Sequence, residues 1–66
     1  MDNLEIWRSA HLLLTLHGVD ALFVAAQSAN ALLDKGDTAG SSAWVQIGHA
    51  IGELLREEPR AGEALN

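Results

Sequence analysis

The sequence predicts an all-α protein, a three-helix antiparallel bundle completed by self-association. Three stretches of the chain repeat their apolar residues at helical spacing. Short glycine-containing junctions separate these stretches, and short connections between long helices place neighbouring helices antiparallel. The predicted domain covers residues 1–58, with helices at about 3–17, 20–34 and 38–57, and residues 59–66 are expected to form a flexible tail.

The first predicted helix has a start and a stop signal. Asp2 and Glu5 are three residues apart ahead of a periodic run, a spacing typical of a helix N-cap with a capping-box partner. Gly18 follows the run and can adopt the left-handed conformation that ends many helices. The helix has one broad apolar face, which comprises Leu4, Ile6, Trp7, Ala10, Leu13 and Leu14.

The second predicted helix begins close behind the first. Asp20 can cap or open it, and Gly36 ends it. Its expected core stripe is Ala21, Leu22, Ala25, Ala26, Ala29, Leu32 and Leu33. No charged residue occurs between Phe23 and Leu33, which places this helix at the centre of the fold or of a dimer.

The third predicted helix begins after Asp37, a further N-cap candidate, and ends before Pro59. Its apolar stripe is Trp44, Ile47, Ile51, Leu54 and Leu55. Gly48 and Gly52 lie four residues apart beside this stripe, and a glycine inside a helix costs roughly 1 kcal/mol relative to alanine. Two such glycines on one strip indicate that another backbone approaches closely.

Composition restricts the partners that we expect. The 66 residues include nine acidic and four basic residues, for a net charge of −5, which argues against nucleic acid and against anionic lipid as partners. The apolar run at residues 12–14 is far shorter than the roughly 20 residues of a membrane span, and no basic signal peptide precedes it. A chain without cysteine fits a cytoplasmic location.

No residue pattern identifies a reaction, so we expect no enzyme activity and no cofactor. His11 and His17 are six residues apart and diverge around a helix, and His49 lies on another helix, so no metal site is predicted. The loop from Gly36 to Gly40 enters a helix but lacks the lysine of a phosphate-binding loop. Trp7 and Trp44 lie on apolar stripes, where core packing is the expected role.

Each predicted helix also carries a second, smaller patch of apolar or small residues. The predicted interface residues are Leu12, Leu16, Phe23, Val45, Gly48 and Gly52. They favour a homodimer or a groove for another protein, and the competing interpretation is that three helices wrapping one another need broad faces. A small acidic regulator that binds a basic partner protein is the second functional hypothesis. Metal or small-ligand binding through the histidines is the third.

The residue order resembles that of a family of short, uncharacterised helical proteins found widely in alphaproteobacteria. The resembling positions are Trp7, His17-Gly18, Asp20-Ala21, Gly36-Asp37, Gly40, Trp44, Ile47 and Ala50-Ile51. The resemblance implies a compact helical fold in a bacterial cytoplasm and brings no activity with it. The uncharged second helix departs from the more charged versions expected in that family, so a partner surface there can be particular to this chain.

Overall fold

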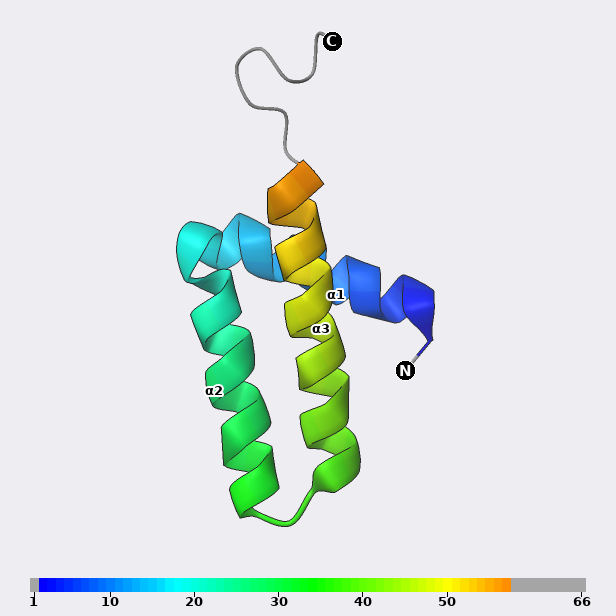
Figure 1. Ribbon diagram of the computed structural model, residues 1–66, viewed down its shortest axis with the longest axis vertical. Helices are drawn as coiled ribbons and strands as arrows, with labels where there is room; N and C mark the ends of the chain where they lie inside the picture. Colours follow the sequence, from blue (N-terminus) through cyan, green and yellow to red (C-terminus); the bar gives the residue numbers. More distant parts are fainter. Residues whose placement is uncertain (1, 58–66) are drawn as a thin grey trace, which may run out of the picture.

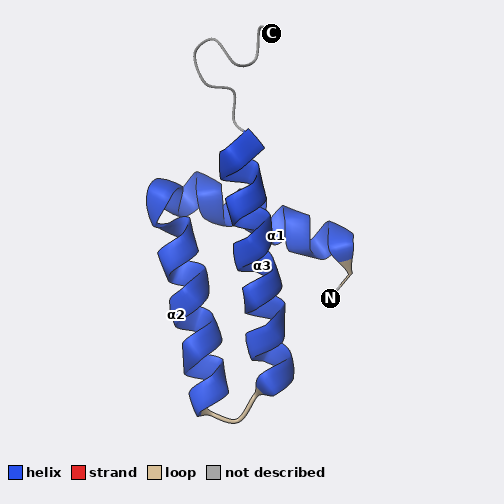
Figure 2. Cartoon of the chain, viewed as in Figure 1, coloured by secondary structure: helices blue, strands red, loops and turns tan. Residues whose placement is uncertain are grey.

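The computed structural model describes residues 2–57 of the chain (Figure 1). Helix α1 spans Asn3–His17, the 3₁₀ turn η1 spans Gly18–Asp20, α2 spans Ala21–Asp34 and α3 spans Thr38–Glu57. The described part is helical apart from Asp2 and a short turn between α2 and α3, and it holds no strand (Figure 2). The predicted end of the third helix at Pro59 and the predicted tail at 59–66 lie outside the described residues.

The three α-helical segments form two continuous helical runs. α1, η1 and α2 follow one another without a non-helical residue, and α3 is separate. α2 and α3 lie side by side as an antiparallel hairpin, and α1 crosses one end of that hairpin (Figure 1). The all-α prediction is therefore confirmed, whereas an antiparallel bundle of three helices is not, because the chain bends at Gly18 into a crossing orientation.

Two predicted helix caps are confirmed. The Glu5 backbone N–H donates to Oδ1 of Asp2 at 2.9 Å, at the start of α1. The Gly40 N–H donates to Oδ1 of Asp37 at 2.8 Å, at the start of α3. Each carboxylate thereby satisfies a backbone donor that the first turn of a helix leaves without a partner.

The junction between α1 and α2 differs from the prediction in one respect. Gly18 has a positive φ of 58°, as expected for the residue that ends α1, and its N–H donates to the Leu14 carbonyl. The sequence allows Asp20 to cap or open the second helix. Asp20 lies directly before α2, but its side chain makes no capping hydrogen bond. The reason is that η1 supplies carbonyl acceptors ahead of α2, since the Ala21 N–H donates to the Gly18 carbonyl.

The core is small and rich in alanine. Its buried apolar residues are Ile6, Ala10 and Leu13 of α1, Ala21, Ala25 and Ala29 of α2, and Ile47, Ala50 and Ile51 of α3. Ile51 is the one large side chain among the described residues that is fully buried. Because alanine side chains are small, α2 and α3 can pack closely, and the interface between them buries little side-chain volume per residue.

Four large apolar residues that the sequence analysis placed on core faces are exposed, and so is the smaller Ala26. Trp7 is 38% exposed, and Leu4, Leu22 and Leu33 are more exposed still. The crossing orientation explains the difference, because α1 meets the hairpin along only part of its length and leaves other apolar positions uncovered (Figure 1). Trp44 is half-buried and packs at the edge of the core.

The run from Asn3 to Asp34 is long and apolar enough to cross a membrane by length and composition, with an 18-residue window of mean hydropathy 1.4. Every such window within this run contains both Gly18 and Asp20. The helix axis turns at Gly18, and the fourteen residues of α2 alone rise about 21 Å, less than the ~30 Å hydrocarbon layer. The folded form described here therefore does not present one straight spanning helix.

Candidate interaction surface

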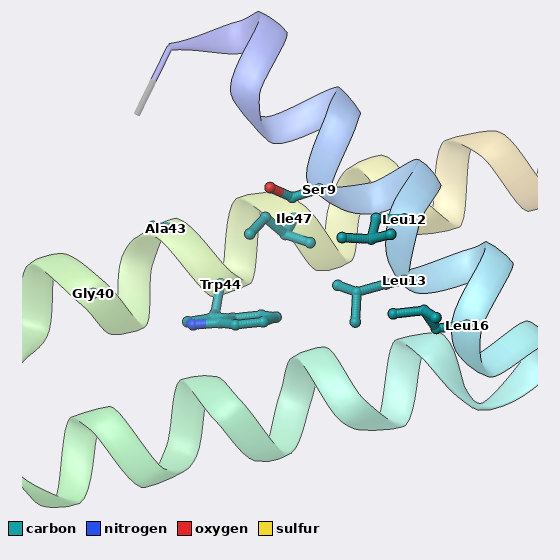
Figure 3. Close-up of a pocket in the computed structure, with 8 residues that line it drawn as sticks. All are labelled: Ser9, Leu12, Leu13, Leu16, Gly40, Ala43, Trp44 and Ile47. Atoms are coloured by element: carbon teal, nitrogen blue, oxygen red, sulfur yellow. The ribbon is translucent and has the colours of Figure 1, made fainter.

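A groove with a mainly apolar lining lies between α1 and α3, and we call it the α1–α3 groove. It has a volume of about 300 Å³. Its lining residues are Ser9, Leu12, Leu13 and Leu16 of α1 and Gly40, Ala43, Trp44 and Ile47 of α3. The leucines reach from α1 toward the side on which Trp44 and Ile47 lie (Figure 3). No charged side chain lines this groove, so it suits an apolar occupant.

A second groove follows the seam of the hairpin, and we call it the α2–α3 groove. It has a volume of about 220 Å³ and is lined by Leu22, Ala25, Ala26 and Ala29 of α2 and by Trp44, Val45, Gly48 and His49 of α3. Trp44 lines both grooves. Trp44 is thus shared by two grooves whose linings together involve all three helices.

The structure distributes the six predicted interface residues over several places. Leu12 and Leu16, 57% and 66% exposed, line the α1–α3 groove. Val45 and Gly48 line the α2–α3 groove. Phe23 and Gly52 line neither groove. Phe23 is 64% exposed on α2, and Gly52 is half-buried on α3.

The exposure predicted for the larger members of this set is confirmed at Leu12, Leu16, Phe23 and Val45. Their use as a contact with a partner stays a prediction.

The two glycines of α3 have different surroundings. A Cβ placed on Gly48 would lie 3.7 Å from the Cβ of Ala25, which is ordinary contact distance. A Cβ on Gly52 would meet nothing within 4 Å. The close neighbour of Gly48 is therefore α2 of the same chain, and a large residue there would disturb the hairpin itself. Among residues 2–57, nothing requires glycine at position 52.

Sequence reasoning missed five of the exposed large apolar residues, namely Leu4, Trp7, Val19, Leu22 and Leu33. Val19 is 85% exposed, the largest exposed fraction among the large apolar residues, and Leu22 is 42% exposed. Val19 lies in the short junction between Gly18 and Asp20, where periodicity gives no face. Leu22 lies on the core stripe that helical periodicity predicts, together with Ala21 and Ala25, but only the two alanines are buried.

The charged and polar residues do not converge on a chemical site. Within residues 2–57 no group of three or more His, Asp or Glu side chains is placed to hold a metal ion. His11 is exposed beside Leu54 and Leu55, and His49 is exposed on α3. Arg56 pairs with Glu53 on the surface, a kind of ion pair that contributes little to stability.

Comparisons with protein families, with curated proteins and with solved structures found no match to this chain. The resemblance to an alphaproteobacterial family therefore stays a prediction, and the function has to be argued from the surface itself.

Proposed function

We propose that this chain is a non-enzymatic protein–protein interaction module that self-associates as a homodimer through the apolar surface around Trp44. The observation that carries the proposal is the mismatch between core and surface. Four large apolar side chains are buried among the described residues, namely Ile6, Leu13, Ile47 and Ile51, whereas Leu12 and Leu16, which line one groove, are each more than half exposed. Exposed apolar side chains gathered on one surface are typical of an interaction site.

The free energy available from burial of Leu12 and Leu16 supports the same proposal. A domain of 66 residues has a net stability of about 3–10 kcal/mol, at roughly 0.05–0.15 kcal/mol per residue. Complete burial of a single leucine contributes about 1.5–3 kcal/mol. Covering Leu12 and Leu16 in a second copy would therefore add an amount comparable to a large part of the stability of the monomer.

A second copy is a suitable occupant because the surface is apolar and uncharged. Two molecules of net charge −5 repel each other, and association is least opposed where charge is absent. Neither Asp, Glu, Lys nor Arg lines the two grooves that share Trp44. The acidic side chains elsewhere would keep other faces of two copies apart.

Light scattering over a range of protein concentrations tests this proposal. The wild type is expected to approach twice the monomer mass as concentration rises, and Leu16→Asp is expected to remain monomeric, because it places a carboxylate in the α1–α3 groove. Gln27→Asp is the matched control, since Gln27 is exposed on α2, lines neither groove and gains the same charge.

A monomeric wild type at every concentration would refute self-association. Equal loss of mass in the Leu16→Asp and Gln27→Asp variants would refute the assigned surface, because charge alone would then explain the effect. If the chain is instead an acidic regulator, the wild type stays monomeric and binds a basic protein in a strongly salt-dependent manner.

A further inference from the structure

The two connections between helices differ in composition. The turn from α2 to α3 carries Asp34, Lys35 and Asp37, polar residues that suit a connection surrounded by water. The bend from α1 to α2 instead exposes four large apolar side chains within eight residues. They are Leu16, Val19, Leu22 and Phe23, which we call the apolar corner.

The helical run that contains this corner is apolar without being buried. Between Arg8 and Asp34, Asp20 is the one residue of the types Asp, Glu, Lys and Arg. The 18-residue window of this run that is apolar enough to cross a membrane is only 22% buried. A helix that is apolar all round is normally enclosed in a core or in lipid, and packing within the described chain does not enclose this one.

The apolar corner is convex. It lies at the outer edge of the molecule, where α1 meets α2 (Figure 1). Leu16 and Leu22 line different grooves, and Val19 lines a third cleft beside Leu54 and Leu55, so the four side chains spread around the bend and form no common hollow. A fluid bilayer can surround such a projection, whereas a specific protein contact requires a partner of complementary shape.

The bend at Gly18 restricts the contact to a corner. Gly18 has a φ of 58°, and both helices lead away from it toward α3, on which they pack (Figure 1). Neither helix can enter a bilayer along its length without losing these contacts. The residues next to the bend are exposed, so they can be covered while the fold stays intact.

We propose that the apolar corner inserts into the headgroup boundary of an electrically neutral, zwitterionic lipid bilayer. Neutral lipid follows from the charge, because the chain carries −5 and no Lys or Arg lies between Arg8 and Asp34 to attract anionic headgroups. Shallow insertion of about 5–10 Å buries apolar side chains and leaves Asp20 close to water. The inference is independent of self-association, since Val19 and Phe23 line neither the α1–α3 nor the α2–α3 groove.

Co-sedimentation with phosphatidylcholine vesicles tests this proposal. Val19→Ser and Phe23→Ser are each expected to lower the partition coefficient by about tenfold, because each replaces a largely exposed apolar side chain with a small polar one. Ala31→Ser is the matched control, since Ala31 is exposed near the other end of α2. Vesicles that contain phosphatidylglycerol are expected to bind less protein, because they repel its net negative charge.

Asp20 provides a test in the opposite direction. Its side chain makes no capping hydrogen bond, so Asp20→Asn is expected to leave the start of α2 intact. Removal of a charge next to the inserted residues is expected to raise the partition coefficient severalfold. Asp34→Asn removes the same charge at the exposed far end of α2 and is expected to change the partition coefficient little.

A fluorescent label gives a direct readout of insertion. The chain has no cysteine, so a nitrobenzoxadiazole label can be attached at a single cysteine introduced at His17, in the corner, or at Lys35, in the α2–α3 turn. Both positions are exposed. With phosphatidylcholine vesicles, the label at position 17 is expected to shift its emission to the blue and to resist quenching by iodide in the water. The label at position 35 is expected to do neither.

The outcomes separate this inference from the proposed function. Binding that is weakened at Val19 and Phe23 but not at Ala31, with protection at position 17, supports the apolar corner whether the protein is a monomer or a dimer. A protein that stays in solution with phosphatidylcholine vesicles overturns the inference and leaves self-association standing. Protection at position 35 overturns the assigned surface. Loss of dimer mass in Val19→Ser without lipid overturns the bilayer as occupant and assigns the corner to a second copy.

Discussion

Replacement of Leu16 by alanine gives a quantitative measure of whether this surface is covered in solution. Leu16 is 66% exposed in the single chain, so about a third of its side chain is buried. Because complete burial contributes about 1.5–3 kcal/mol, Leu16→Ala is expected to cost only about 0.5–1 kcal/mol in a monomer. If a second copy covers Leu16, the cost rises to the ~2–5 kcal/mol typical of a leucine truncated in a core.

The assay is urea unfolding followed by circular dichroism at two protein concentrations a hundredfold apart. For a dimer, the midpoint of unfolding rises with concentration, because folding and association are coupled. Ile51→Ala serves as the internal reference, since Ile51 is fully buried and its truncation costs about 2–5 kcal/mol whether the chain is a monomer or a dimer. We expect Leu16→Ala to cost as much as Ile51→Ala. If Leu16→Ala lowers the free energy of unfolding by less than about 1 kcal/mol, and the urea midpoints do not depend on protein concentration, then no second copy covers this surface in solution.

Four further predictions concern the helices and the histidines. Gly52→Ala is expected to raise the free energy of unfolding by about 0.5–1 kcal/mol, measured by thermal melting, because its Cβ meets nothing within 4 Å; a loss of stability would instead indicate a close partner at Gly52. Asp37→Ala is expected to lower it by about 1 kcal/mol through loss of the α3 cap. Gly40→Ala is expected to change the free energy of unfolding little in the wild type, because the higher helix propensity of alanine is offset by the contact of its Cβ, 2.5 Å from Oδ2 of Asp37. In the Asp37→Ala background that contact is absent, and Gly40→Ala is expected to be stabilising. Equal effects in both backgrounds would contradict the interaction between positions 37 and 40. Melting temperatures with zinc and with a chelator are expected to coincide, since no group of three ligands is assembled within residues 2–57; a rise with zinc would revive the histidine hypothesis.

Local signals in the sequence predicted the local structure well. Asp2 and Asp37 cap helices as expected, and Gly18 and Gly36 have the positive φ expected where helices end. These features depend on residues within one helical turn of each other, so the sequence around each position is enough to predict them. The predicted exposure of Leu12 follows from the same local periodicity.

The orientation of α1 could not be predicted in this way. Gly18 signals an end to α1, but the direction of the next helix depends on the ψ of Gly18 and on the 3₁₀ conformation that follows. That direction decides that Trp7 and Leu22 are exposed and that Trp44 borders two grooves. The proposed surface depends on the same angle, because the α1–α3 groove exists only where α1 crosses the hairpin.

At the alanines that line the inner face of α2, the hairpin tolerates a smaller side chain but not a larger one. Ala21, Ala25 and Ala29 are buried, and each can lose only a methyl group, so a smaller residue removes little contact area. A larger residue at any of them would push α2 away from α3 and widen the groove that Trp44 borders. Enlargement at these positions would therefore remodel the α2–α3 groove, which Ala25 and Ala29 themselves line.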